Sequence, residues 1–168
     1  MNKIIIIAVI ILITAVAVFA QRTQKDFKNK IDSYIDYSVP IITVDELKDQ
    51  TKNYLLLDIR ERKEYDISHL CDAVHIGYKD PDFSSLKGID KSQPIVVYCS
   101  IGYRSEKIGE RLLENGFTNV RNLYGSIFEW VNQDQPIYDS NQQVTDKIHT
   151  YNRKWSKWMI NEEYQKVY

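Results

Sequence analysis

Short apolar runs alternate with amphipathic stretches through the middle of the chain. The runs at residues 54–59 and 94–98 are largely apolar, which is typical of strands buried on both faces of a sheet. Other stretches carry apolar residues at helical spacing, such as 106–115, after which Gly116 marks the stop. Strands that alternate with helices predict an α/β fold, in which a parallel sheet has helices on both faces.

These patterns give approximate positions for each element. Five strands are expected at residues 41–42, 54–59, 73–76, 94–98 and 119–123. Helices or helical turns are expected at residues 43–50, 62–67, 83–86, 106–115 and 127–131. The first of these helices has its own start signal, because Thr43 can cap it and Glu46 can reach back to the cap.

One cysteine lies where a buried strand ends and a helix is about to begin. Cys99 directly follows the apolar run 95–98, and Arg104 lies just ahead of the amphipathic stretch. The first N–H groups of a helix have no partner within it, and the helix dipole adds roughly half a positive charge there. Such surroundings can lower a cysteine pKa from about 8.5 to between ~3.5 and ~7.5. Cys99 is therefore the candidate nucleophile; the alternative is a small apolar residue at a strand end.

The loop that follows Cys99 is short. Four residues separate Cys99 from Arg104, and Gly102 lets the backbone turn tightly. A loop of this length turns successive N–H groups inward, which forms a nest for an anion. The candidate substrate-binding residues are Ser100, Ile101, Gly102, Tyr103 and Arg104.

Three ordered motifs resemble those of rhodanese-like domains, in particular the single-domain sulfurtransferases. The loop Cys99 to Arg104 is similar to the six-residue active loop of that family. Upstream, the matching residues are Asp58, Arg60, Glu64, Tyr65, His69, Ala73 and Ile76. Downstream, the segment 123–127 with Trp130 resembles the family's closing Gly-Gly motif. The similarity covers about residues 39–136.

The chain departs from the family pattern in two places. In the turn after the first motif, Ser68, Cys71 and Asp72 stand where the family usually has Gly, Pro and Gly. In the closing motif, Ser126 stands in place of the second glycine. Neither change touches the expected nucleophile.

The resemblance implies a sheet of about five strands and sulfurtransferase activity. Cys99 would carry a sulfane sulfur as a persulfide, taken from a small anionic donor such as thiosulfate and passed to a thiol or cyanide. A protein could also be the sulfur acceptor, and no metal or organic cofactor is needed. A binding or regulatory module without significant catalysis is the alternative. Cysteine-dependent phosphatases need one more loop residue, a position that Ser105 occupies here.

Other candidate residues have mainly structural interpretations. Asp58 and Arg60 are expected to support the site by tying neighbouring loops through a charge-assisted hydrogen bond, although they could also bind substrate. Cys71 precedes a strand whereas Cys99 follows one, so a packing role is favoured over a disulfide. The three histidines lack zinc-ligand spacing with the cysteines and receive no catalytic role.

The N-terminal residues form a separate segment. Residues 4–20 are apolar except for Thr14, and a helix of that length reaches about 26 Å against a hydrocarbon core of ~30 Å. This pattern predicts a single-pass membrane anchor, or else a signal peptide that is cleaved before Gln21. The domain is expected on the outer side of a bacterial inner membrane, with a secreted or a cytoplasm-facing domain as alternatives.

The remaining boundaries follow from composition. We expect an anchor or signal at residues 1–22, a linker or helical stalk at 23–38, the rhodanese-like domain at 39–136 and a tail at 137–168. In the tail, helical spacing relates Ile148, Tyr151, Trp155, Trp158 and Met159 and predicts a docked C-terminal helix. An aromatic helix at a membrane interface, or a site for a partner, is the alternative. The net charge of −1 gives no electrostatic reason to expect nucleic acid as a partner.

Overall fold

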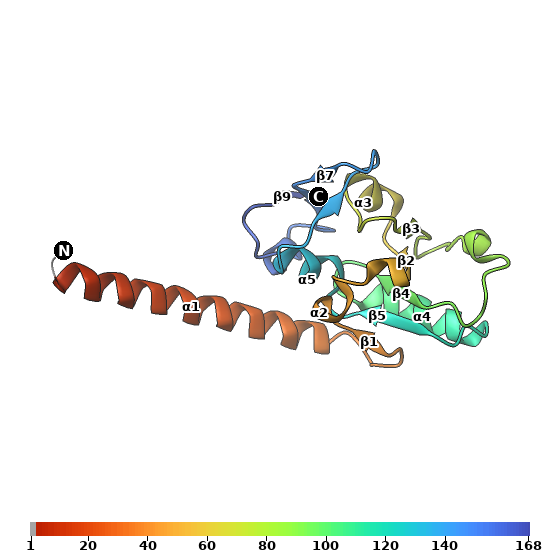
Figure 1. Cartoon of the computed structure of the whole chain (residues 1–168), viewed down its shortest axis with the longest axis horizontal. Helices are drawn as coiled ribbons and strands as arrows, with labels where there is room; N and C mark the ends of the chain where they lie inside the picture. The colour runs from red at the N-terminus through yellow and green to blue at the C-terminus, as the bar shows by residue number, and fades with distance from the viewer. Residues whose placement is uncertain (1–2) are drawn as a thin grey trace.

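A five-stranded parallel sheet forms the centre of the structure, a computed structural model that describes residues 3–168 (Figure 1). The strand order is β1-β5-β4-β2-β3, and all four neighbouring pairs are parallel. The strands are β1 (Ile41–Ile42), β2 (Leu55–Asp58), β3 (Val74–His75), β4 (Ile95–Tyr98) and β5 (Val120–Leu123). The α/β fold and the number of strands predicted from the sequence are confirmed.

Helices cover both faces of this sheet because side chains alternate along the central strand. On one face, Val96 and Tyr98 of β4 belong to a buried cluster with residues of α1, α2 and α5. On the other face, Ile95 and Val97 belong to a cluster with residues of α4 and η2. The helical elements are α1 (Lys3–Asp32), α2 (Val44–Leu47), η1 (Thr51–Asn53), α3 (Arg62–Ile67), η2 (Phe83–Leu86), α4 (Tyr103–Glu114) and α5 (Ser126–Asn132).

The capping box predicted at the start of α2 is present. The Glu46 N–H donates to the Thr43 hydroxyl at 3.3 Å, and the Thr43 N–H donates to the Glu46 carboxylate at 2.8 Å. The helix is shorter than expected, because α2 ends at Leu47 and the chain continues into the 3-10 turn η1.

Removal of this cap gives a prediction of modest size. Replacement of Thr43 by alanine leaves the first N–H groups of α2 without their side-chain acceptor, so the free energy of unfolding should fall by about 1 kcal/mol. Urea denaturation followed by circular dichroism measures this change. A variant as stable as the wild type would show that water replaces the cap at no cost.

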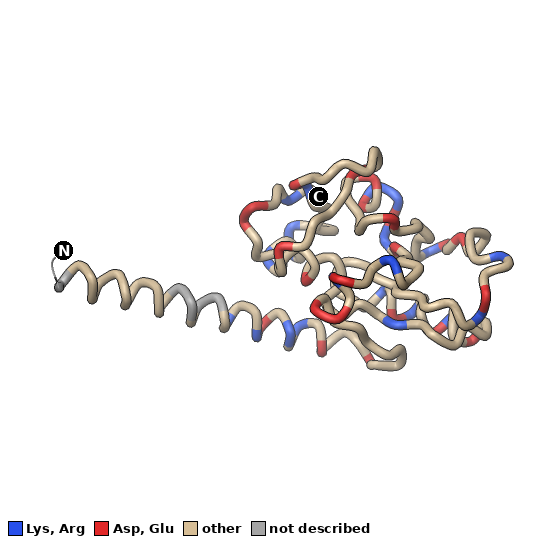
Figure 2. Tube along the Cα trace, in the orientation of Figure 1, with Lys and Arg blue, Asp and Glu red and all other residues tan. Residues whose placement is uncertain are grey.

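The helix α1 extends well beyond the sheet (Figure 1). Its last turns are docked on the domain, since Phe27 and Ile31 are fully buried and Phe27 stacks on Trp158 with ring centroids 5.8 Å apart. Figure 2 shows charged residues gathered on the half of α1 nearest the domain. The segment expected as a linker or helical stalk at residues 23–38 is therefore helical to Asp32 and is packed against the core.

The predicted membrane anchor or signal is not supported by the structure. Among the residues that the structure describes, no helix is both long and apolar enough to cross a bilayer. The apolar residues of α1 are continuous with the polar turns up to Asp32, so they are part of one longer helix. Met1 and Asn2, which begin the predicted segment, lie outside the described residues.

The C-terminal helix predicted over residues 148–159 is wrong. The tail instead forms β6 (Ile137–Tyr138), β7 (Val144–Thr145), β8 (Lys147–His149), η3 (Ser156–Trp158) and β9 (Gln165–Val167). Tyr151 adopts a positive φ of 65°, which ends the extended segment, and the Asn152 side chain then accepts the N–H of Trp155 at 3.2 Å in a tight turn. Docking of the tail is present, because Ile148 and Met159 are fully buried in the core.

Candidate active site

The candidate nucleophile lies at the carboxyl end of the central strand. Cys99 directly follows β4, and its backbone N–H donates to the Ser126 hydroxyl at 3.0 Å. Its sulfur accepts the N–H of Gly102 at 3.2 Å. Gly102 has a φ of +117°, a conformation that side-chain-bearing residues rarely adopt, and it is the N-cap residue of α4. The glycine therefore allows the backbone to curl back onto the sulfur.

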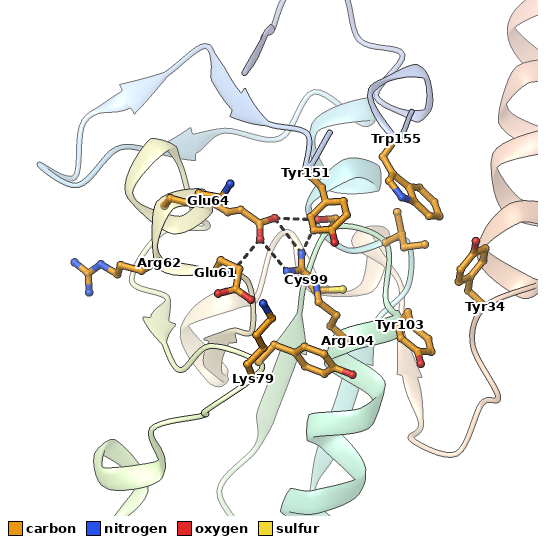
Figure 3. A pocket seen from close by; sticks show the side chains of 14 residues that line it. Tyr34, Glu61, Arg62, Glu64, Lys79, Cys99, Tyr103, Arg104, Tyr151 and Trp155 are labelled. Atoms are coloured by element: carbon orange, nitrogen blue, oxygen red, sulfur yellow. Dashed lines mark hydrogen bonds and ion pairs between the residues drawn. The ribbon is translucent and has the colours of Figure 1, made fainter. Parts of the chain in front are cut away.

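An ion pair fixes the arginine beside this loop (Figure 3). The Arg104 guanidinium donates two hydrogen bonds to the carboxylate of Glu64, at 2.8 Å and 3.0 Å, and a third to the Ser100 hydroxyl at 2.9 Å. Glu64 lies on α3 and its side chain is fully buried, whereas 13% of the Arg104 side chain is exposed. A bidentate pair of this kind holds the orientation of the guanidinium.

The environment of Cys99 favours the thiolate. Burial works to raise the pKa of the thiol, but the positive charge of Arg104 and hydrogen bonds from Ser105 and Gly102 outweigh it, so the pKa lies below its ordinary value. Burial likewise opposes the charge of Glu64, yet the hydrogen bonds and charge of Arg104 hold the pKa of that carboxyl low. The thiolate of Cys99 therefore persists to a lower pH than that of an ordinary cysteine.

Loss of the arginine charge should change the titration of this thiol. In an Arg104→Gln variant the thiol pKa should rise, so the ascending limb of a plot of alkylation rate against pH should move to higher pH. The expected direction follows because a lowered pKa lets Cys99 stay ionised, and therefore reactive, at lower pH. Without the charge of Arg104 the thiol should ionise only at higher pH. Iodoacetamide alkylation of Cys99, in a Cys71→Ala background, measures the pKa without turnover.

Two companion variants make this measurement specific. Arg111→Gln removes a positive charge from the same helix, but the Arg111 guanidinium stacks on Phe83. This variant should leave the plot of alkylation rate against pH unchanged. The double variant Arg104→Gln, Glu64→Gln avoids a buried carboxylate without its partner and should show the same upward move as Arg104→Gln. An unchanged profile in both Arg104 variants would mean that the loop N–H groups alone set the pKa.

The loop faces a cavity with a volume of about 730 Å³. Of the residues expected at the site, Cys99, Ser100, Ile101, Tyr103 and Arg104 line this cavity. Gly102 contributes its N–H to the sulfur instead of a cavity wall. The volume falls within the range of small-molecule sites, about 300–1,000 Å³.

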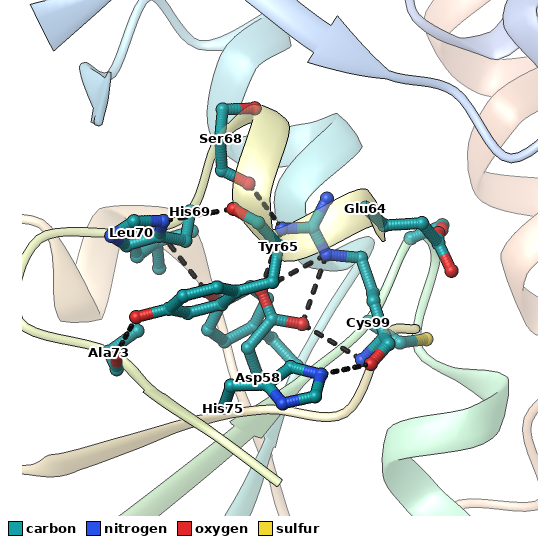
Figure 4. A network of polar contacts seen from close by, with 12 residues as sticks. Asp58, Glu64, Tyr65, Ser68, His69, Leu70, Ala73, His75 and Cys99 are labelled. Carbon is teal, nitrogen blue, oxygen red and sulfur yellow. Dashed lines mark hydrogen bonds and ion pairs between the residues drawn. The ribbon is translucent and has the colours of Figure 1, made fainter. Parts of the chain in front are cut away.

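Neither Asp58 nor Arg60 lines the cavity. Figure 4 shows Asp58 within a network of polar contacts. Both side chains are fully buried, and the Arg60 guanidinium is 2.6 Å from the Asp58 carboxylate. Arg60 also donates to the backbone carbonyl of Ser68, and its own carbonyl contacts the ring of His75 at 2.9 Å. The pair therefore joins the end of β2 to the turn after α3 and to β3. The supporting role of the pair in the site stays a prediction.

The turn that departs from the family pattern keeps its shape through other contacts. Asp72 adopts a positive φ of 57°, a conformation in which the family's usual glycine is less strained. The Tyr65 hydroxyl donates to the carbonyl of Ala73 at 2.8 Å, and the Tyr65 ring stacks on His69 with centroids 4.0 Å apart. Cys71 is a free thiol in this turn, as is Cys99 in its loop.

The sequence interpretation missed two groups of site residues. Glu64 was quoted only as part of a motif, although an acidic residue upstream of a buried arginine is a signal for an ion pair. Tyr34, Tyr151 and Trp155 also line the cavity, and they come from segments interpreted as a stalk and a tail. No local pattern could have located these three aromatic residues, because their positions depend on how α1 and the C-terminal segment pack.

The fold combines a parallel α/β sheet with a cysteine loop at the carboxyl end of its central strand and an arginine at the start of the following helix. The sequence matches the family described as "Rhodanese-like domain" over residues 43–133, which is more than half of the chain. The chain belongs to this family.

Curated relatives carry sulfurtransferase names. "Thiosulfate sulfurtransferase GlpE" of Coxiella burnetii (strain RSA 331 / Henzerling II) is 30% identical over 91 residues, which cover 54% of this chain and 83% of that protein. "Adenylyltransferase and sulfurtransferase UBA4" of Candida albicans (strain SC5314 / ATCC MYA-2876) is 29% identical over 94 residues, which cover 51% of this chain and 21% of that protein.

Solved structures agree in fold. The rhodanese-like domain of the Alr3790 protein from Anabaena sp superposes with a TM-score of 0.55 at 23% identity, covering 60% of this chain and 79% of the other. A thiosulfate sulfurtransferase from Pseudomonas aeruginosa superposes with a TM-score of 0.53 at 19% identity, covering 72% of this chain and 23% of the other. At these identities the likeness concerns the fold alone.

Proposed function

We propose that the protein is a sulfurtransferase that carries a sulfane sulfur as a persulfide on Cys99. One observation carries this proposal: the Cys99 sulfur accepts the Gly102 N–H at 3.2 Å, and Cys99 lines a cavity together with Arg104. The name of the Coxiella relative supports thiosulfate as a donor class.

The reaction begins with attack of the Cys99 thiolate on the outer sulfur of thiosulfate. A bond forms between the Cys99 sulfur and that outer sulfur, the S–S bond of the donor breaks, and its electron pair leaves with sulfite. The lowered pKa of Cys99 supplies the nucleophile without a separate general base. Arg104 draws the anionic donor into the cavity, and Glu64 fixes where the guanidinium stands.

The acceptor completes the cycle in a second attack on the outer sulfur. A thiolate or cyanide forms a bond to that sulfur, the bond between the two sulfurs on Cys99 breaks, and the electron pair returns to the Cys99 thiolate. Donors at the start of α4 and the N–H of Gly102 stabilise the negative charge of the persulfide, in the manner of an oxyanion hole.

Mass spectrometry tests this proposal directly. The intact protein is treated with thiosulfate, desalted and measured, and we expect a gain in mass of one sulfur atom that maps to the peptide containing Cys99. Cyanide should then remove that mass and release thiocyanate. A protein that gains no sulfur, or gains it on Cys71, would contradict the proposal.

A further inference from the structure

Five aromatic residues line the cavity above Cys99, and three of them come from outside the segment that matches the family. Tyr34 follows α1, whereas Tyr151 and Trp155 belong to the C-terminal segment; the matched segment is residues 43–133. Figure 3 shows Tyr34, Tyr151 and Trp155 arranged around the mouth of the site, together with Tyr103 of α4. The two ends of the chain therefore add a wall to the site that the family domain alone would lack.

Three of these aromatic rings contact one another. Tyr34 meets Trp155 edge to face at a centroid distance of 5.3 Å and meets Tyr103 in the same way at 6.2 Å. The ammonium group of Lys30 lies 4.5 Å from the centre of the Tyr34 ring. Edge-to-face rings of this kind hold one another's orientation. We name these three residues, Tyr34, Tyr103 and Trp155, the aromatic wall.

Tyr151 lies close to Arg104 and has an unfavourable backbone conformation. Its backbone has a φ of 65°, uncommon for a residue with a bulky side chain, and its N–H donates to His149 at 3.0 Å. Its ring lies 5.3 Å from the Arg104 guanidinium carbon. The unusual φ of Tyr151 places its ring over Arg104, and backbone strain at such a position points to a functional reason.

These rings remain available to a ligand. The exposed fractions are 37% for Tyr34, 41% for Tyr103 and 49% for Tyr151, although all three line the cavity. Aromatic faces are electron-rich, so they offer little to thiosulfate or cyanide, which are small and anionic. The wall instead suits the other partner of the cycle, a molecule with an apolar body.

We propose that the physiological sulfur acceptor is a small organic thiol with an aromatic or otherwise apolar body, held by the aromatic wall and Tyr151. This inference rests on the proposed function. The acceptor's thiolate attacks the outer sulfur of the Cys99 persulfide, the bond between the two sulfurs on Cys99 breaks, and the Cys99 thiolate leaves. The thiol proton goes to solvent, and the product is an organic persulfide.

The experiment measures the second half-reaction alone. The persulfide is formed with thiosulfate, freed of donor and then discharged in a single turnover by benzyl mercaptan or by 2-mercaptoethanol. We expect a second-order rate constant for benzyl mercaptan about tenfold higher or more, because only this thiol has a ring that the wall can bind. A ratio near one would overturn the inference while leaving the proposed function intact.

Variants assign the selectivity to the wall. Tyr34→Ala should lower the ratio of the two rate constants about three- to tenfold, and Tyr34→Phe should restore it, since the ring provides the contacts. Tyr151→Ala provides a second test on another element. Tyr168→Ala is the matched control, because Tyr168 is 53% exposed and does not line the cavity. An unchanged ratio in Tyr34→Ala and Tyr151→Ala would refute the assignment.

Equilibrium binding separates this inference from the proposed function. Calorimetry with Cys99→Ser protein, which keeps the wall, should detect benzyl mercaptan at concentrations where 2-mercaptoethanol gives no signal. If thiosulfate forms no persulfide, the proposed function fails. This binding measurement still shows whether the aromatic wall binds an aromatic thiol. Equal affinity for the two thiols would count against the wall in either case.

Discussion

Cys99→Ser should abolish sulfur transfer from thiosulfate to cyanide, with a loss of about 10³-fold or more in kcat. A serine hydroxyl does not ionise in this loop and cannot form a persulfide, whereas the Cys99 thiol has a lowered pKa and accepts the Gly102 N–H. The change from sulfur to oxygen is small, so the fold should be retained. Steady-state thiocyanate formation and circular dichroism check the two parts of this expectation.

The second cysteine supplies the matched control for this experiment. Burial and the nearby Asp72 raise the pKa of Cys71, and it lies in the turn after α3 rather than in the active loop. Cys71→Ala should therefore keep turnover within a few-fold of the wild type. Substantial residual activity in Cys99→Ser, together with a large loss in Cys71→Ala, would transfer the role of sulfur carrier to Cys71.

The sheet and the active loop could be predicted because the signals for both are local. Each strand is a short apolar run, and the position of Cys99 between such a run and an amphipathic stretch places it at a carboxyl end of the sheet. The spacing from Cys99 to Arg104 is also local, because only a short loop and the first residue of α4 lie between them. Local patterns of this kind depend little on how distant segments pack.

The tail was mispredicted for a related reason. Ile148 and Met159 are spaced as on a helix, but each is buried by a different contact of an irregular segment, and hydrophobic spacing alone cannot tell these cases apart. The decisive interactions are long-range: the Asn132 side chain on α5 donates to the Trp158 carbonyl at 2.9 Å and accepts the Ile160 N–H at 2.8 Å. The aromatic wall is hidden from the sequence in the same way.

The two buried ion pairs differ because Glu64 and Arg104 line the cavity, whereas Asp58 and Arg60 do not. Asp58 and Arg60 are both fully buried and tie β2 to the turn at Ser68, so their effect on catalysis passes through the backbone. Arg104 is partly exposed to the cavity and is oriented by Glu64. A pair in which one member reaches the substrate combines charge with a fixed position, which a free surface arginine would lack.

Insertion of one glycine after Gly102 should lower sulfur transfer by about a hundredfold, because a ~1 Å misplacement of reacting groups can cost that much. Gly102 is anchored immediately before the insertion point: its N–H donates to the Cys99 sulfur, and its carbonyl accepts the Asn122 side-chain amide at 2.9 Å. An extra residue between this anchor and Arg104 widens the ring of N–H groups. The persulfide then loses the donors that stabilise its charge.

Two assays on three proteins decide what the loop size means. The wild type should transfer sulfur and show negligible phosphatase activity on aryl phosphates, since its nest is small for a phosphate with three outer oxygens. A glycine inserted after Gly88, where a side chain would meet nothing within 4 Å, is the matched control and should leave sulfur transfer unchanged. Full sulfur transfer in the Gly102 insertion, with native circular dichroism, would show that the size of the loop does not control the reaction. Robust phosphatase activity in the wild type without sulfur transfer would overturn the assignment of this site to sulfur chemistry.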